Sequence, residues 1–270
     1  MTVTGTDELK VDVADGVAVL TLNRPQARNA LNPSMRDALI DAVRQCRGDD
    51  AVRALLITGA DGVFCAGADL AGSSLGRVTE PDFDPRSMSH QLEVGANTLI
   101  TELWTLDKPT VACVEGAAVG PGAHLALACD FVLVSAETKF IWSFSKLGLV
   151  VDGGGAYLLP RLVGLPRAKA MVLLSEGCKG EEAVTDGLAY RCVPSDQLYD
   201  ESLALARRLA AGPTRALGMS KRLLNDSFET PLARSLHAEA ASQALAASTA
   251  DVKEGLTAIR EKRDPNFRGK

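Results

Sequence analysis

The sequence predicts an α/β fold in which strand-strand-helix units form the first half and helices form the last third. Residues 9–13 and 17–22 alternate between apolar and polar side chains on either side of Asp15-Gly16, which is the pattern of a β-hairpin. Beyond the three glycines at 153–155, apolar residues recur almost wholly at helical spacing. A β-rich core with a helical C-terminal extension fits this order better than a doubly wound sheet.

The elements of the first half follow from their start and stop signals. After the hairpin, Asn32 is suited to cap a helix whose first residue is Pro33 and which ends before Gly48. Residues 72–86 are rich in Gly, Ser, Pro and charge, so this segment is expected to be irregular and mobile. The other expected elements are strands at 54–58, 110–114, 131–135 and 139–142, and helices at 89–104 and from the 116–122 turn to about residue 129.

The second half is predicted to be helical apart from one strand at 190–193. The expected helices cover residues 156–162, 166–175, 180–186, 196–210, 213–224, 231–247 and 251–262. We divide the chain into a core at residues 1–200 and a helical oligomerisation region at residues 201–270. The apolar stripes of this second region exceed what a small core covers, which favours packing on another subunit, with wrapping around the chain's own core as the alternative.

Composition excludes several classes of function. With a net charge of −5 and scattered basic residues, the chain lacks the basic patch of a nucleic-acid-binding protein. No stretch approaches the roughly 18 consecutive apolar residues of a membrane span, and residues 1–10 lack the pattern of a signal peptide. The six cysteines form no C-x-x-C pair and have no metal-ligand spacing. We therefore expect a reduced cytoplasmic protein with no nucleic-acid or membrane partner, no metal and no redox cofactor.

Two short motifs are better explained by chance than by function. Gly120-Pro-Gly122 precedes a helix, but a dinucleotide-binding turn needs a third Gly or Ala where this chain has Leu125. Ser143 and Lys146 match S-x-x-K, although the companion motifs of serine acyltransferases are absent from the sequence.

Two turns that lead from a buried strand toward a helix carry more weight. They are F-C-A-G-A-D at residues 64–69 and G-A-A-V-G-P-G at residues 116–122. Small residues allow a ligand to approach the backbone, and free N–H groups at a helix N-terminus carry partial positive charge. Two such turns facing one carbonyl oxygen would form an oxyanion hole. The alternative is a purely structural role, because glycine turns before helices are common.

Other motifs accompany these turns along nearly the whole chain. They are N-R-P-Q-A-R-N-A-L at 23–31, K-P-T-V-A at 108–112, L-A-L-A-C-D at 125–130, D-G-G-G at 152–155 and L-P-R-L-V-G at 159–164. In this order, the set resembles the crotonase (enoyl-CoA hydratase/isomerase) superfamily. The resemblance implies a spiral of ββα units with a helical C-terminal trimerisation region, and homotrimers often paired into hexamers. It also implies an acyl-CoA substrate of which coenzyme A is a part, with no separate cofactor.

The resemblance further implies which residues bind the substrate. Coenzyme A is expected near Arg24, Ala27, Ala66, Ala68, Asp69 and Leu70, and the Ala66 N–H is expected to be the first oxyanion donor. The second donor in the family comes from the middle of the glycine turn, where this chain has Pro121, which has no N–H. We expect Gly122 or another nearby amide to replace it. Lys262 is expected to reach the CoA phosphates across a subunit boundary, with simple surface charge as the alternative.

The sequence departs from the hydratases of this superfamily, which place two glutamates around one water. By alignment, these positions hold His124 and Phe144, which cannot together activate water as a carboxylate pair does. His124 lies one turn from the proposed oxyanion site, so we treat it as either catalytic or structural, with a pKa lowered by the helix N-terminus. Trp142 and Phe144 are candidates for the acyl pocket, although core packing explains aromatic residues equally well.

Asp152 is the acid at the most promising place. It matches the aspartate of superfamily members that have an L-V-P-D-x-G-G pattern. This pattern resembles that of ring-1,2-epoxyphenylacetyl-CoA isomerase and other enoyl-CoA isomerases. A carboxylate in an apolar pocket has a raised pKa and is a better base near neutral pH. Its alternative role is to cap the helix that starts after the glycines.

The sequence therefore favours an isomerase-type proton transfer with Asp152 as base. The alternatives are an enoyl-CoA hydratase with a non-standard site and an acyl-CoA-binding protein without catalytic activity. The orientation of the Asp152 carboxylate separates the enzyme from the binding protein.

Overall fold

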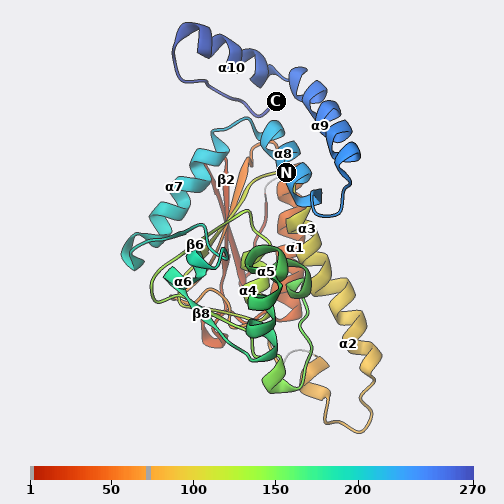
Figure 1. Cartoon of the computed structure of the whole chain (residues 1–270). Coiled ribbons are helices and arrows are strands. Elements are labelled where there is room, and N and C mark those ends of the chain that lie inside the picture. The colour runs from red at the N-terminus through yellow and green to blue at the C-terminus, as the bar shows by residue number, and fades with distance from the viewer. Residues whose placement is uncertain (1–2, 71–73) are drawn as a thin grey trace.

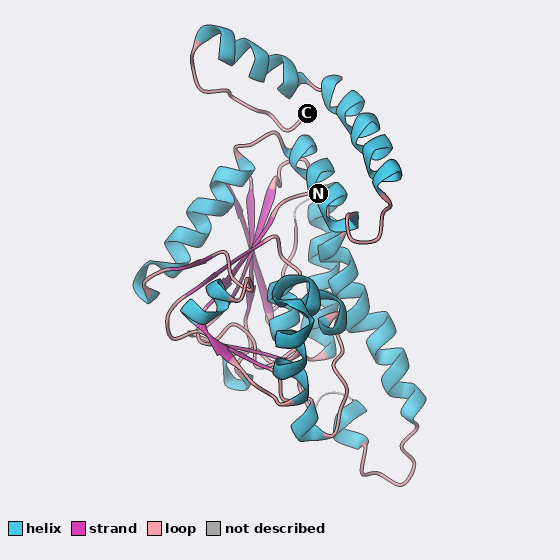
Figure 2. Cartoon of the chain, viewed as in Figure 1, coloured by secondary structure: helices cyan, strands magenta, loops and turns pink. Residues whose placement is uncertain are grey.

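The computed structural model describes residues 3–70 and 74–270 (Figure 1). The described residues form two β-sheets with helices packed around them (Figure 2). The larger sheet contains, in spatial order, β1 (Leu9–Ala14), β2 (Val17–Leu22), β3 (Ala54–Gly59), β4 (Thr110–Val114), β6 (Phe131–Val134) and β9 (Arg191–Cys192). The smaller sheet contains β5 (Ala117–Val119), β7 (Lys139–Ile141) and β8 (Cys178–Lys179).

The helices cover these sheets and extend beyond them. They are α1 (Pro33–Gly48), α2 (Pro85–Gln91), α3 (Thr98–Trp104), α4 (Pro121–Leu127), α5 (Gly155–Leu173), α6 (Gly180–Thr185), α7 (Leu198–Ala210), α8 (Thr214–Asp226), α9 (Leu232–Ala247) and α10 (Ala250–Glu261). A π-helical segment, Leu92–Asn97, joins α2 to α3, and helices of this type occur often at functional sites.

The chain winds between the two sheets as a spiral. β1 and β2 form an antiparallel hairpin, and β2, β3, β4, β6 and β9 then pair in parallel. After β4 the chain enters β5 of the small sheet, returns to β6, and leaves again for β7. This alternation agrees with the α/β spiral predicted from the sequence.

Both faces of strands β2, β3, β4 and β6 are largely buried, which explains their nearly continuous apolar sequences, whereas the edge strand β1 is mostly exposed. In β3, Leu55 and Ile57 face a cluster that includes residues of α1 and α4, whereas Leu56 faces a second cluster with residues of α7. Each fully buried leucine or isoleucine side chain contributes about 1.5–3 kcal/mol relative to exposure. The sheet is therefore a rigid frame from which the turns after β3 and β4 project.

Several boundaries differ from the predicted ones for local reasons. The helix expected at residue 89 starts at Pro85, because Asp84 accepts a hydrogen bond from the Arg86 N–H and caps it. The two helices expected at residues 156–162 and 166–175 both form, as the two halves of α5, because Gly164 between them has a non-helical φ of 75° and ψ of 158°. Part of the segment predicted to be irregular forms a 3₁₀ turn, Ser74–Arg77, and residues 71–73 lie outside the described residues.

The C-terminal helices extend away from the sheets, and α9 and α10 lie at one end of the molecule (Figure 1). The chain then returns to the core, where the Arg53 guanidinium donates a hydrogen bond to the Phe267 carbonyl at 3.1 Å. Large apolar side chains on α8, α9, α10 and the turn after α8 stay exposed: Leu224, Phe228, Leu232, Leu236, Leu245, Leu256 and Ile259. This apolar surface is the one predicted to pack on another subunit.

Candidate active site

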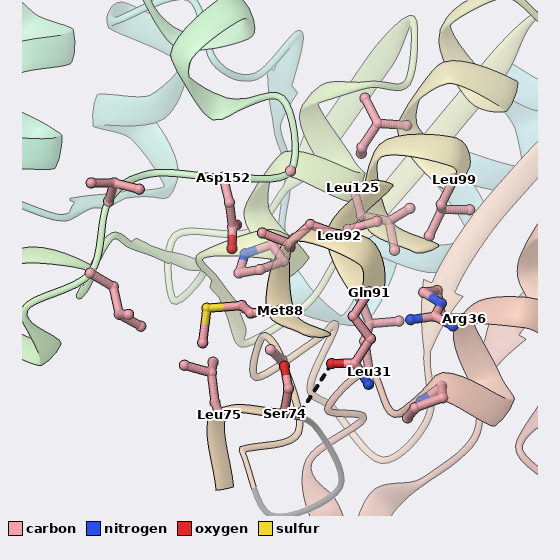
Figure 3. Close-up of a pocket in the computed structure, with 18 residues that line it drawn as sticks. Leu31, Arg36, Ser74, Leu75, Met88, Gln91, Leu92, Leu99, Leu125 and Asp152 are labelled. Carbon is pink, nitrogen blue, oxygen red and sulfur yellow. Dashed lines mark hydrogen bonds between the residues drawn. The ribbon is translucent and has the colours of Figure 1, made fainter. Parts of the chain in front are cut away.

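An apolar pocket of about 140 Å³ lies between the start of α1, the segment from α2 to α3, the start of α4 and the loop before α5 (Figure 3). Its apolar lining residues are Leu31, Pro33, Ala68, Leu75, Met88, Leu92, Ala96, Leu99, Ile100, Pro121, Leu125, Leu149 and Val150. Its polar side chains are those of Arg36, Ser74, Gln91 and Asp152. An apolar hollow with a few polar groups is the usual form of a small-molecule site.

Asp152 supplies the acidic group of this lining, and its carboxylate points into the pocket (Figure 3). One carboxylate oxygen, Oδ1, is buried and has no hydrogen-bond partner among the described residues. Burial raises the pKa of Asp152 to about 6, and a hydrogen bond from its own backbone N–H opposes part of that rise. At neutral pH the side chain is thus mostly ionised, yet basic enough to accept a proton.

The Asp152 side chain does not cap α5. The cap residue of that helix is Gly154, and the Gly155 N–H donates to the backbone carbonyl of Asp152 at 2.9 Å. Gly153 and Gly154 have φ values of 49° and 81°, which L side chains rarely adopt. These two glycines make the turn from which the carboxylate reaches the pocket.

His124 lies behind the pocket and not on its lining. Its ring is fully buried and stacks on Phe144, and its Nε2 accepts a hydrogen bond from the Trp142 indole at 3.1 Å. Trp142 and Phe144 are also buried, and none of the three side chains lines the pocket, which favours the structural and core-packing alternatives. Burial lowers the pKa of His124 to about 4, with the Asp152 carbonyl opposing part of the shift. The predicted direction of the pKa shift is right, and burial is its largest cause.

The His124 ring supports the loop that carries Asp152. A Cβ on Gly155 would overlap the ring, and one on Gly153 would lie 3.6 Å from Nδ1. The His124 ring therefore packs against the glycine turn and leaves no room for a side chain at Gly155.

The loop from Phe64 to Asp69 places Ala68, and not Ala66, beside the pocket. The Ala66 N–H donates to the Arg28 carbonyl at 3.0 Å, so the predicted oxyanion donor is already engaged. On the neighbouring strand-like segment, the Leu31 N–H bonds to the Gly67 carbonyl and the Asp69 N–H bonds to the Leu31 carbonyl. Within the described chain, no acceptor pairs with the Ala68 N–H, and Ala68 lines the pocket. The prediction for Ala66 is corrected accordingly.

The two turns singled out in the sequence are in contact. A Cβ on Gly122 would lie within 2.8 Å of Cys65, so glycine is required for this close approach. Gly120 has φ 47° and starts the turn into α4, and Pro121 lines the pocket. The Gly122 N–H, in the first turn of α4, has no acceptor among residues 3–70 and 74–270. Gly122 itself lies just behind the lining.

Of the predicted coenzyme A contacts, Ala68 lines the pocket, whereas Arg24, Ala27, Asp69 and Leu70 do not. The Arg24 guanidinium forms ion pairs with Asp69 at 2.9 Å and with Glu8 at 3.0 Å, so it holds the 64–69 loop against the hairpin. Ala27 ends a 3₁₀ turn, and Leu70 is half exposed beside the residues that are not described. Arg24 and Asp69 thus have a structural role, whether or not they also contact a ligand.

Lys262 lies far along the chain from these residues, at the C-terminal end of α10. Its side chain is exposed, and Figure 1 shows α10 at the end of the molecule beyond the sheets. Within one subunit Lys262 is separate from the pocket.

The sequence analysis did not identify Arg36, Ser74 or Gln91 as site residues. Arg36 follows the capped start of α1 by one turn, which puts it on the same end of the helix as Leu31 and Pro33. Gln91 precedes a π-helical segment that no local sequence pattern predicts. The helical spacing could have indicated Arg36, but the position of Gln91 depends on tertiary packing.

Comparisons with known proteins identify the class. The sequence profile described as "Enoyl-CoA hydratase/isomerase" matches residues 12–270. The 1,2-epoxyphenylacetyl-CoA isomerase of Escherichia coli is 40% identical over 258 residues, covering 96% of this chain and 97% of that protein. The crotonyl-CoA hydratase of Syntrophomonas wolfei is 34% identical and covers 97% and 98% of the two chains. A crystal structure of an enoyl-CoA hydratase from Bacillus anthracis superposes with a TM-score of 0.90 at 28% identity, covering 97% and 100%.

The fold and the site are therefore those of an enzyme that acts on acyl-CoA thioesters. The chain belongs to the enoyl-CoA hydratase/isomerase family. The family resemblance and the fold class predicted from the sequence are confirmed.

Three further observations concern cofactors and location. No helix in the described ranges is long and apolar enough to cross a membrane. The same ranges contain no cluster of three or more His, Cys, Asp or Glu side chains arranged to hold a metal ion. All six cysteines are free thiols, and Cys192 is the one among them that is partly exposed.

Proposed function

We propose that this enzyme isomerises acyl-CoA thioesters by moving a proton, with Asp152 as the base. The observation that carries the proposal is the Asp152 carboxylate, which points into an apolar pocket with a pKa raised to about 6. The carboxylate accepts a proton from a carbon conjugated with the thioester and returns it to another carbon of the same system. The double bond shifts and no water is consumed.

The enolate formed in between needs hydrogen-bond donors at its oxygen. We assign the Ala68 N–H and the Gly122 N–H to this role, since both lack an acceptor in the described part of the chain and their two turns are in contact. A single donor of this kind contributes roughly 10²–10³ in rate. Pro121 keeps the start of α4 in place without supplying a donor.

Hydration is the second candidate activity, and the pocket argues against it. Adding water across a double bond requires groups that both activate the water and protonate carbon. Among the described lining residues, Asp152 is the one carboxylate, and the family's glutamate positions hold the buried His124 and Phe144. An inactive acyl-CoA-binding protein would have no use for an unpaired buried carboxylate, which costs stability.

The pocket volume limits the acyl group. Its volume of about 140 Å³ is close to that of an engineered cavity of about 150 Å³ that binds benzene. The 40% identical relative is named for an epoxide of phenylacetyl-CoA, so a ring or a chain of similar bulk is the first acyl group to test.

We also propose how the whole enzyme is assembled. Residues 1–200 form the catalytic core, and residues 201–270 form the contacts of a homotrimer, or of a hexamer of two trimers. The exposed apolar side chains of α8, α9 and α10 support this division. In such an assembly Lys262 reaches the CoA phosphates of a neighbouring subunit. Coenzyme A enters as part of the substrate, no other cofactor takes part, and the enzyme acts in the cytoplasm.

The test is proton exchange in deuterated buffer with a panel of enoyl- and acyl-CoA thioesters, with the exchange monitored by NMR. The native enzyme should exchange an α or γ proton or shift the double bond. The Asp152→Asn substitution should lower the rate of this reaction about 10²–10⁴-fold. Because the base must be ionised, the rate should rise about tenfold per pH unit below pH 6 and level off above it.

Arg24→Gln is a useful comparison, because it disturbs the loop at the pocket mouth without touching the base. Exchange that is equally fast in the native enzyme and in Asp152→Asn would refute the assignment of the base. If the native enzyme formed a hydrated product, the proposed activity would be hydration and not isomerisation.

A further inference from the structure

One cation lies in the lining of the apolar pocket. Arg36 extends from α1, its side chain is 16% exposed, and it lines the pocket with Leu31 and Pro33. Its guanidinium lies against the backbone of Gly95 in the π-helical segment, where any Cβ would overlap it. Gly95 thus leaves the space that the guanidinium occupies.

The hydrogen bonds of Arg36 leave part of the guanidinium unpaired. Nε donates to the exposed carboxylate of Asp37 at 2.8 Å, and Nη2 lies 2.7 Å from the same oxygen. In the described part of the chain, Nη1 has no acceptor. A guanidinium has five N–H donors and no acceptor, so its open edge requires an oxygen from a ligand or from water.

A second donor lies on the same side of the pocket. The Gln91 side-chain oxygen accepts a hydrogen bond from the Ser74 N–H at 3.0 Å (Figure 3). Because a backbone N–H can only donate, this bond fixes the amide orientation and leaves the Gln91 NH₂ group free to donate. In Figure 3, Asp152 lies on one side of the pocket, and Arg36 and Gln91 lie on the other.

We propose that this pocket selects acyl groups whose far end carries a carboxylate. The inference rests on the proposed function, since it requires the acyl group to occupy the pocket with its reacting carbons at Asp152. The apolar side chains of Leu92 and Leu125 lie between the two ends and suit the methylene part of such an acyl group. At the far end, a carboxylate accepts hydrogen bonds from the remaining N–H donors of Arg36 and from Gln91. A hydrocarbon end would leave those donors without an acceptor.

The experiment compares two saturated thioesters of matched shape by titration calorimetry. Adipyl-CoA ends in a carboxylate, and 6-methylheptanoyl-CoA replaces that carboxylate with an isopropyl group of similar outline. Neither has a double bond to move, so binding is measured without turnover. A charge-assisted hydrogen bond changes affinity by roughly 10- to 100-fold, so the native enzyme should bind adipyl-CoA more tightly by that factor.

Variants on the same helix test which cation is responsible. Arg36→Met keeps the length of the side chain without its charge, and it should abolish or invert the preference. Arg44→Met is the matched control, because Arg44 is also on α1 but pairs with Glu102 outside the pocket, and it should keep the preference. Gln91→Leu should reduce the preference by a smaller factor, and it tests the site independently if Arg36→Met does not fold.

The outcomes separate this inference from the function it rests on. Equal affinity for the two thioesters, or tighter binding of 6-methylheptanoyl-CoA by the native enzyme, overturns the selection of a carboxylate even if proton exchange occurs. A preference that survives in both Arg36→Met and Gln91→Leu overturns the assignment to this side of the pocket. Failure of both thioesters to bind, together with no proton exchange, overturns the proposed function as well.

Discussion

Replacing Asp152 with Asn should make the folded protein more stable at neutral pH. The two side chains have nearly the same shape, but Asn carries no charge. In the native enzyme, burial raises the pKa of Asp152 from 3.8 to about 6, because the ionised form loses solvation in the pocket. An ionised carboxylate in this position therefore costs stability that the unfolded chain does not lose.

The size of this cost follows from the two pKa values. The rise from 3.8 to about 6 corresponds to up to about 3 kcal/mol, and we expect less because the side chain is only half-buried. Below pH 3.8 both states bind the proton and the native enzyme has its full stability. Between pH 3.8 and about 6 the unfolded chain releases the proton first, so stability falls as the pH rises. Above pH 6 the loss is complete and constant.

Thermal unfolding at a series of pH values between about 4 and 8 measures the effect. For a chain of this size, 1 kcal/mol shifts the midpoint by roughly 2–4 °C, so Asp152→Asn should gain several degrees at pH 8. The gain should shrink toward zero near pH 4. Asp41→Asn, which changes an exposed carboxylate on α1, should show no comparable gain. A midpoint for Asp152→Asn that is unchanged at pH 8, or that rises equally at pH 4 and pH 8, would refute the desolvation of the carboxylate.

Two further substitutions test the support behind the Asp152 loop. Trp142→Phe leaves the buried His124 Nε2 without its donor, so urea unfolding should show a loss of about 1–3 kcal/mol, and an unchanged stability would contradict the hydrogen bond. Gly155→Ala places a Cβ on the His124 ring, so it should cost about 1–3 kcal/mol and slow proton exchange by moving the loop. Gly48→Ala, where a Cβ meets nothing within 4 Å, should change stability by no more than about 1 kcal/mol and leave exchange intact. Equal effects of the two alanines would show that the contact with the ring is unimportant.

The elements with strong local signals were predictable from the sequence. The alternating hairpin and the helix capped by Asn32 occur where they were expected, because period-two patterns and capping residues act over a few neighbours. β5 and β8 were missed as strands. Each has two or three residues and depends on pairing with β7, which no local pattern encodes.

The site was predictable in its motifs and less so in its atoms. The family motifs led to Asp152 and to the two turns, but not to the orientation of each N–H. The peptide of Ala66 is engaged by Arg28, which is distant in sequence, so only the folded chain shows that Ala68 has the available donor. The resemblance placed His124 where hydratases have a glutamate, but its burial behind the glycine turn follows from packing with Trp142 and Phe144, which the motifs do not encode. Arg36 belongs to the pocket because Gly95, almost sixty residues later, makes room for it.

The strand order of the large sheet has a consequence for how the enzyme is made. β1, β2, β3, β4, β6 and β9 lie side by side in the order in which the ribosome synthesises them, so no strand must insert between two that have already paired. Every residue that lines the pocket lies between positions 31 and 153, and the His124 ring that supports the loop lies within the same interval. A nascent chain can therefore assemble the catalytic pocket while the later helices are still being translated. The apolar helices that extend from the molecule emerge last, when a folded core is already present to receive them.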